Sequence, residues 1–305
     1  MEHTTNIDTL KLQIDFRFSS EQREVMNNIS KCLITTYSFL NVTYDTSTNV
    51  ALTHRVHTAG TKILELVSGS YQNIYKNTIY FIAIEFAGLK RYNKFDKIAM
   101  DCLIRVVAYL NTNNILFNFT GIDIAVDIHI PFINTYSFCN KKAPHVTYYT
   151  TYEKQPYAST QYIEKFLLTH HRVMKRAYLY DKSIKEEDLC YNITRFELKL
   201  QSNFFNKHPF MVGVLEKELD RYHILCFPTL QEKAIALSMY AQYENIIRRR
   251  DLHKLGLEQY RILPYTNKID SFLFSLYTIY ESDLNLACKN RSKPDNDARV
   301  RPDAK

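Results

Sequence analysis

The chain has 305 residues, of which 46% are hydrophobic and 23% are charged, a balance typical of a globular protein with a buried core. This length suits one large domain or two domains of roughly 150 residues each. The formal net charge of +7 fits a polyanionic partner. The chain contains only six glycines, and they form neither a G-x-G-x-x-G nor a G-x-x-x-x-G-K-[ST] loop, which argues against a Rossmann dinucleotide site and a P-loop NTPase.

The cysteines and the apolar segments indicate the cellular compartment of the protein. The six cysteines are scattered without a C-x-x-C pair, which favours reduced thiols of an intracellular protein. The first residues lack the basic and apolar regions of a signal peptide. No apolar run approaches the roughly 18 residues that a spanning helix needs. We therefore expect a cytoplasmic protein with no membrane partner.

The first part of the chain mixes strand and helix patterns. Residues 7–18 alternate apolar and polar side chains, which predicts a half-buried strand. A helical pattern then runs to about residue 39, with Ser19 or Ser20 as the expected cap. Residues 61–67 and 78–87 are rich in β-branched and aromatic side chains and predict two strands, and residues 95–110 have helical spacing.

The later part continues as strands and then turns helical. Strands are predicted over 115–131, 146–152, 175–182 and 192–200, with a helix over 160–170. Helices are predicted over 210–222, 229–250 and 268–286. The sequence thus predicts an α+β fold: a central, mostly antiparallel sheet with packed helices over 1–202, a helical C-terminal region over 203–288 and a disordered tail over 289–305.

Three of these strands carry polar side chains that a purely structural strand would not need. The period of two places them on a common face of each strand: Asp123, Asp127 and His129 in 121–130; Arg176, Tyr178, Tyr180 and Lys182 in 175–182; Arg195, Glu197 and Lys199 in 192–200. The solvated side of an antiparallel sheet gives the same alternation without any function. Taken together, however, these side chains supply what metal-assisted attack on a phosphodiester requires.

Each residue type has a defined part in that chemistry. Carboxylate oxygens hold Mg²⁺ or Mn²⁺, and the metal polarises the scissile phosphate. A tyrosine hydroxyl forms a covalent intermediate, and a lysine or arginine neutralises the developing charge. Asp123 and Asp127 are about 13 Å apart at roughly 3.3 Å per residue, so one would bind an ion and the other support it unless the strand bends. His129 is a further metal candidate, although a lone histidine is more often a surface residue.

The order of five segments resembles a known family. IDTLKLQIDF, IEFAGLKRY, GIDIAVDI, RAYLYDK and ITRFELKL follow one another over residues 7–202. This arrangement resembles the Rep_trans family of rolling-circle replication initiators, which includes plasmid Rep proteins and related conjugative relaxases. The resemblance implies a strand-borne tyrosine that nicks one DNA strand, leaving a 5′-phosphotyrosyl link and a free 3′-OH primer. It also implies a divalent metal held by acidic residues.

The resemblance assigns the nucleophile to the segment around residue 180. Tyr180, Asp181 and Lys182 match the family's Y-D-K. Tyr180 is therefore the expected nucleophile, Tyr178 on the same face is its rival, and Lys182 is the expected catalytic cation.

The resemblance also assigns the acidic residues. Asp123 and Asp127 match the family's R-I-D-x-A-x-D strand, and Glu197 matches the glutamate of R-[IF]-E. These three are the expected metal ligands. Gly121 stands where the family has an arginine, and the family's G-S-R-x-S element has no clean counterpart.

Basic clusters suit contacts with DNA phosphates, and the affinity of such contacts falls steeply with salt. Charge runs at helix ends are also commonly solvated. The residues expected to contact DNA are Lys90, Arg91, Lys94, Arg176, Arg195, Arg248, Arg249 and Arg250. The expected partner is single-stranded or supercoiled origin DNA. Because the chain has no NTPase loop, unwinding must come from elsewhere, and a host helicase and a homodimer are left open as partners.

Three alternatives stand beside a nicking replication initiator. A conjugative relaxase would use the same chemistry. A non-catalytic DNA-binding protein would keep the fold and the salt-sensitive affinity but form no covalent adduct. A globular protein with an AT-biased composition and an unrelated function would bind DNA only weakly and nonspecifically.

Overall fold

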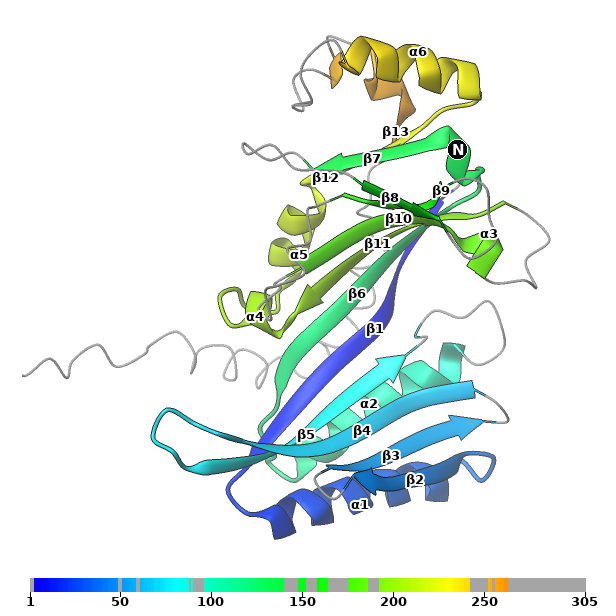
Figure 1. Ribbon diagram of the computed structural model, residues 1–305. Coiled ribbons are helices and arrows are strands. Elements are labelled where there is room, and N and C mark those ends of the chain that lie inside the picture. Colours follow the sequence, from blue (N-terminus) through cyan, green and yellow to red (C-terminus); the bar gives the residue numbers. More distant parts are fainter. Residues whose placement is uncertain are drawn as a thin grey trace, which may run out of the picture. The chain divides into compact units, whose positions relative to one another are not determined.

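The computed structural model describes residues 3–48, 51–58, 61–87, 89, 96–139, 148–151, 158–163, 175–185, 192–241, 252–253 and 256–262 (Figure 1). The fold is α+β with a large, mostly antiparallel sheet, which confirms the predicted class. The chain forms two units that interleave in sequence. Unit 1 contains Met1–Lys11, Glu85–Ala99 and Thr120–Phe272, and unit 2 contains Leu12–Ile84, Met100–Phe119 and Leu273–Lys305. The sequence-based boundary at residue 202 stays a prediction.

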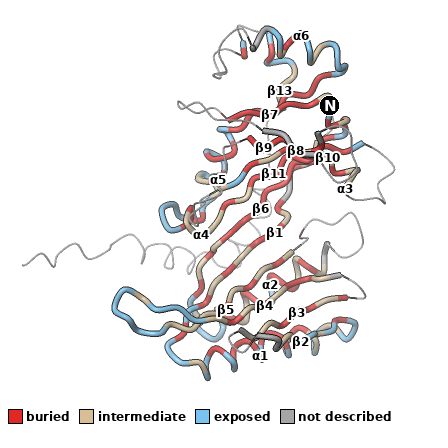
Figure 2. The backbone as a smooth tube through the Cα atoms, viewed as in Figure 1, coloured by how far each residue is buried: buried red, intermediate tan, exposed pale blue. Residues whose placement is uncertain are grey.

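Unit 1 is built on a sheet whose strands come from distant parts of the chain. Their order is β1 (His3–Phe16), β6 (Asn118–Ile128), β11 (Thr194–Gln201), β10 (Lys175–Asp181), β9 (Ala158–Tyr162) and β8 (Tyr148–Thr151). Each neighbouring pair from β6 to β8 is antiparallel. From Gly121 to Ile128, β6 is buried on both faces, although one face carries aspartates (Figure 2). The aspartates therefore need partners inside the protein.

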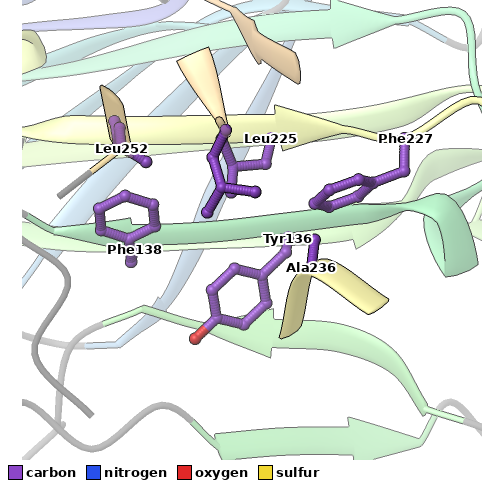
Figure 3. Packing of buried hydrophobic residues seen from close by; sticks show 7 residues of the cluster. Tyr136, Phe138, Leu225, Phe227, Ala236 and Leu252 are labelled. Carbon is purple, nitrogen blue, oxygen red and sulfur yellow. The ribbon is translucent and has the colours of Figure 1, made fainter. Parts of the chain in front are cut away.

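A smaller sheet in unit 1 carries its own core. Its order is β13 (Arg261–Ile262), β12 (Tyr222–Cys226) and β7 (Thr135–Cys139). Tyr136 and Phe138 on β7 pack with Leu225 on β12, with Phe227 and with Ala236 of α6 (Leu230–Ala241) (Figure 3). The short elements of unit 1 are η1 (Phe132–Asn134), α3 (Lys182–Lys185), α4 (Ser202–Phe205), α5 (Val212–Leu219) and η2 (Glu258–Tyr260).

Unit 2 packs helix α1 (Ser19–Thr36) on strands β2 (Asn41–Thr48), β3 (Ala51–Thr58) and β4 (Thr61–Gln72). Val25, Met26, Ile29 and Leu33 of α1 are buried, and their spacing defines one apolar helix face. Strand β5 (Thr78–Ala87) follows β4 in the sheet, and α2 (Asp96–Thr112) has most of its residues in this unit.

Several expected elements need correction. Residues 160–162 lie in β9, so the helix predicted over 160–170 is wrong there, and 164–170 lie outside the described residues. The predicted helical region from 203 contains α5 and α6 but also β12 and β13. Helix α1 is not capped as expected, because its N-cap residue is Phe18 and makes no side-chain cap bond. The segments 242–250, 268–286 and 289–305 are outside the described part of the chain.

Among the described residues, no helix is both long and apolar enough to cross a membrane.

The small-sheet core yields a stability prediction. The Phe227 side chain is fully buried, and its ring centroid lies 4.9 Å from that of Tyr260. Phe227→Ala should lower the free energy of unfolding by about 3–5 kcal/mol, because it leaves a cavity. Ile235→Ala, at a 55% exposed position of α6, is the matched control and should change it by less than about 0.5 kcal/mol. Equal losses in urea denaturation would contradict this packing.

Candidate functional site

The register of three neighbouring strands brings the predicted polar faces together. Directly opposite residues of an antiparallel pair share a face. Reading across β10, β11 and β6, the rows are Tyr180–Arg195–Asp127, Tyr178–Glu197–Ala125 and Arg176–Lys199–Asp123. Side chains more than 50 residues apart in sequence thus form one continuous surface on the sheet of unit 1.

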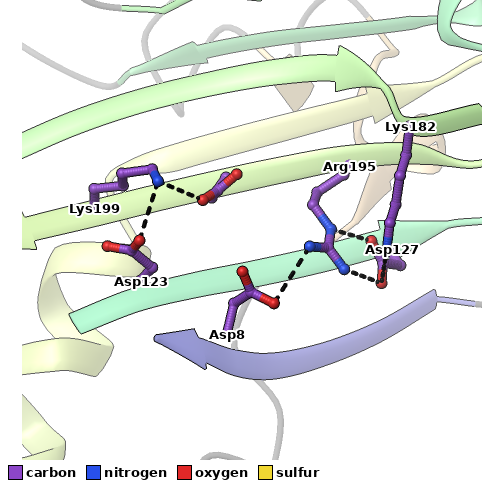
Figure 4. Close-up of polar contacts among 7 residues, drawn as sticks. Asp8, Asp123, Asp127, Lys182, Arg195 and Lys199 are labelled. Atoms are coloured by element: carbon purple, nitrogen blue, oxygen red, sulfur yellow. Dashed lines mark hydrogen bonds and ion pairs between the residues drawn. The ribbon is translucent and has the colours of Figure 1, made fainter. Parts of the chain in front are cut away.

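One end of this face is a buried network, the Arg195 group, made of Arg195, Asp127, Asp8 and Lys182 (Figure 4). Arg195 donates from Nε to Asp127 Oδ1 at 2.6 Å and from Nη2 to Oδ2 at 2.9 Å. Its Nη1 lies 3.5 Å from Asp8 Oδ1, and Lys182 Nζ lies 3.9 Å from Asp127 Oδ2. Two carboxylates lie beside two cations, so ion pairing offsets the free-energy cost of burying these charges.

The other end is the Lys199 group, made of Lys199, Asp123, Glu197 and Tyr178. Lys199 Nζ lies 3.0 Å from Asp123 Oδ2 and 2.9 Å from Glu197 Oε1. It also lies 5.8 Å from the centre of the Tyr178 ring. Asp123 and Glu197 are both buried, while Lys199 is partly exposed. Two carboxylates share one ammonium here, so the Lys199 group itself has one carboxylate more than it has cations.

The two candidate tyrosines lie in a row of aromatic rings that spans β9 and β10. The Tyr162 and Tyr178 ring centroids are 6.0 Å apart, and those of Tyr178 and Tyr180 are 5.8 Å apart. Burial and the charge of Glu197 raise the pKa of both Tyr178 and Tyr180 above the usual value. Tyr180 is 7% exposed and Tyr178 is half-buried. Both hydroxyls therefore carry their protons at neutral pH.

The charged neighbours of the tyrosines are also shifted. Burial raises the pKa of Asp8 and of Asp123, and the cations beside them only partly offset this. Burial alone would lower the pKa of Lys199, but Glu197 and Asp123 raise it above its ordinary value. Lys199 is thus held as an ammonium ion beside the carboxylates.

The segment Tyr180–Asp181–Lys182 has a local structural role as well. Asp181 ends β10, and its Oδ1 accepts hydrogen bonds from the backbone N–H of Ser183 at 3.0 Å and of Ile184 at 3.3 Å. This side-chain cap starts α3 directly after the strand. Lys182, which is 1% exposed, then turns its ammonium toward Asp127. The cap therefore fixes the strand end that carries Tyr180.

The four predicted metal ligands do not gather at one point. Asp123 and Glu197 lie together around Lys199, whereas both oxygens of Asp127 accept hydrogen bonds from Arg195. His129 is exposed just beyond the end of β6. No group of three or more His, Cys, Asp or Glu side chains placed to hold a metal occurs among the described residues. We derive no step through a metal, and the Mg²⁺ or Mn²⁺ requirement stays a prediction.

The predicted DNA contacts fall in different places. Arg176 is exposed on β10, in the same row as Lys199. Arg195 is 4% exposed, with its guanidinium directed at carboxylates. Lys90, Arg91, Lys94, Arg248, Arg249 and Arg250 lie outside the described residues.

Sequence reasoning placed Lys199 on this face without choosing it as a site residue, and it missed Asp8 altogether. Asp8 and Lys199 were not selected, although Lys199 shares the face of Glu197 by the period of two. Asp8 has no such signal, because only the pairing of distant strands brings it to Arg195. The glycine at position 121, where the family has an arginine, lies against the Lys11 side chain. A Cβ at this position would lie 3.1 Å from Cδ of Lys11, whose ammonium pairs with Glu85 at 2.6 Å.

The Arg195 group yields a second prediction. Arg195→Met should lower the free energy of unfolding by about 3–5 kcal/mol, because it leaves Asp127 buried without its strongest partner. Arg105→Met, which breaks an ion pair with both side chains 44% exposed, should cost at most about 1 kcal/mol. Urea denaturation of both variants measures the difference. A loss for Arg195→Met no larger than that of the control would contradict the buried pairing.

Comparisons with known proteins give limited information. No protein-family model matches the chain, and no curated protein matches it significantly. Among solved structures, the chain is similar to the rolling circle replication initiator protein from Geobacillus stearothermophilus. The TM-score is 0.39 at 14% sequence identity, and the match covers 87% of this chain and 100% of that one. At this level of similarity the function must be argued from the residues themselves.

Proposed function

We propose that this protein initiates rolling-circle replication by nicking one DNA strand at an origin through a tyrosine nucleophile. The observation that carries the proposal is the shared face of β6, β10 and β11. The strand register joins two tyrosines, three carboxylates, one lysine and two arginines on this face. Lys182, which follows β10, adds a second lysine beside Asp127. The sequence resemblance to the Rep_trans family supports the same chemistry.

The proposed reaction exchanges one phosphodiester for another. The Tyr180 Oη attacks the scissile phosphorus, so that an Oη–P bond forms while the bond from phosphorus to the 3′ oxygen breaks. The phenolic proton would pass to a carboxylate, and we propose Glu197 for this role because it is the diagonal neighbour of Tyr180 across β10 and β11. The departing 3′ oxygen takes up a proton and becomes the 3′-OH primer. The 5′-phosphotyrosyl link preserves the energy needed to rejoin the strand.

The cations of this face have separate roles in the proposal. Lys199 offsets one of the two negative charges of Asp123 and Glu197 and so reduces their repulsion of a DNA phosphate. Burial raises the pKa of Tyr180, and the positive charge of Arg195 partly opposes this rise. Arg195 would therefore stabilise the tyrosinate anion. Lys182 and Arg195 also hold Asp127, so their own charge is largely offset. A bound Mg²⁺ or Mn²⁺ would add positive charge beside the phosphate, and we keep it in the proposal as a requirement to be tested.

Tyr180 is proposed as the nucleophile, with Tyr178 as its rival. Purified protein, Mg²⁺ or Mn²⁺ and labelled single-stranded origin DNA should give a covalent band on a denaturing gel. Tyr180→Phe should abolish the band, because removing the hydroxyl removes the attacking oxygen. Tyr162→Phe, in the same aromatic row, is the matched control and should retain it.

The other outcomes of this assay separate the alternatives. If the band survives Tyr180→Phe but is lost in Tyr178→Phe, the nucleophile is Tyr178 and the proposed function stands. The absence of any band, together with tight salt-sensitive binding, would refute nicking and favour a non-catalytic DNA-binding protein. A substrate of transfer-origin DNA in place of replication-origin DNA would distinguish a conjugative relaxase.

A further prediction concerns how DNA is held. Arg176 lies exposed beside the Lys199 group, where a phosphate of the bound strand would pass. Arg176→Ala should weaken binding equally for all DNA sequences and reduce the slope of log K against log salt by about 1. Fluorescence anisotropy over a salt series measures both quantities. An unchanged slope would remove Arg176 from the phosphate contacts.

A further inference from the structure

The hairpin of β4 and β5 in unit 2 ends in two exposed apolar side chains. At its tip, Ile74 is 89% exposed and Tyr75 is 76% exposed, far more than the other large hydrophobic residues of the hairpin. Figure 2 draws the end of this hairpin as exposed. An isolated exposed apolar residue is common on protein surfaces. Two adjacent exposed apolar side chains on a hydrogen-bonded turn are a different case, because the turn holds both of them in the solvent.

The tip is held rigidly by its own hydrogen bonds. Asn73 Oδ1 accepts from the backbone N–H of Tyr75 and of Asn77, both at 3.0 Å. The backbone N–H of Asn73 donates to the Asn77 carbonyl at 3.0 Å, and that of Lys76 donates to the Asn73 carbonyl at 2.9 Å. Lys76 adopts a φ of 60°, which closes the turn. The two apolar side chains therefore stand on a preformed loop.

The base of the hairpin is fixed by helix α1. Gln22 Nε2 donates to the carbonyl of Gly69 on β4 at 2.9 Å and to that of Phe81 on β5 at 2.6 Å, so one side chain clamps both strands. A Cβ on Gly69 would lie 2.5 Å from Cζ of Phe81, so glycine is what allows the ring to lie against β4. The hairpin is thus supported at both ends.

The distal part of the hairpin, between Glu65 and Glu85, has a charge that suits a polyanion. From residue 66 to residue 84 the sequence contains no aspartate or glutamate, and its one charged side chain is Lys76 at the tip. Asparagine, glutamine, serine, threonine and tyrosine side chains supply the remaining polar groups of this range. The acidic neighbour of this part is Asp15, which accepts a hydrogen bond from the Tyr71 hydroxyl at 3.4 Å. The tip itself combines apolar side chains with hydrogen-bond donors and a cation, so it adds no repulsion of its own toward DNA phosphates.

We propose that this tip is a wedge that inserts Ile74 and Tyr75 into a base step of duplex DNA and unstacks it. Apolar side chains that enter a base step kink and open the duplex, and an aromatic ring stacks on the exposed base. The inference rests on the proposed function for its DNA substrate, and it adds the opening of the duplex that a nick in one strand requires. A rigid tip suits this role because little ordering is needed on insertion.

The test uses a duplex that contains 2-aminopurine, whose fluorescence rises when the base is unstacked. The full-length protein should raise this fluorescence, and the double variant Ile74→Ser/Tyr75→Ser should lose the rise. Leu116→Ser, at a 77% exposed position of unit 2, is the matched control and should retain it. Because all three side chains are exposed, both variants should keep the thermal midpoint of the unchanged protein.

A second measurement separates the wedge from the nicking chemistry. The double variant should form the covalent adduct with single-stranded DNA at the rate of the unchanged protein, since a single strand needs no opening. Its affinity for single-stranded DNA should change by less than about twofold, because phosphate contacts dominate nonspecific affinity. An unchanged fluorescence rise in the double variant would overturn the wedge proposal. Self-association of the protein through the tip, with no change in the fluorescence of the DNA, would overturn it as well. A fluorescence rise without any adduct would instead refute the nicking function and leave the wedge standing.

Discussion

The buried ion pair between Asp127 and Arg195 is the constraint on which the rest of the candidate site depends. A carboxylate that is 1% exposed would be unstable alone, and the bidentate guanidinium on the neighbouring strand compensates for its burial. This pairing requires β6 and β11 to meet in one register, because a slip by one residue would turn both side chains to opposite faces. The same register places Tyr180 beside Arg195. A structural requirement and the proposed chemistry therefore depend on the same strand pairing.

The two ends of the polar face have different electrostatic character, and this difference organises the proposed reaction. The Arg195 group balances its charges internally and acts as a rigid support. The Lys199 group has one carboxylate in excess and is partly exposed, so it is the end at which a cation, and with it a phosphate, would enter. The hairpin of unit 2 presents a third property, an apolar tip without acidic residues. In the proposed account, one unit opens the duplex and the other carries out the strand transfer.

Much of this arrangement follows from periodicity alone, and the rest depends on long-range pairing. Strand β5 has the bounds that its β-branched and aromatic run predicts, and the polar faces of β6, β10 and β11 follow from the period of two. Strands β2 and β3 were missed because they are rich in threonine and lack a strong apolar alternation. The contact of Asp8 with Arg195 joins residues 187 positions apart, which no local pattern reveals. Residues 160–162, expected in a helix, instead lie in strand β9, because pairing with β10 on one side and β8 on the other outweighed their local preference.

The most direct test of the central claim is to locate the attachment point of DNA by mass spectrometry. Trypsin should release residues 177–182, AYLYDK, as one peptide, because Arg176 precedes it and Lys182 ends it. After reaction and nuclease digestion, the account predicts that this peptide carries a 5′-phosphonucleotide, and that fragmentation between Tyr178 and Tyr180 assigns it to Tyr180. A nucleotide on a residue outside this peptide, or unmodified protein after complete strand cleavage, would contradict the account.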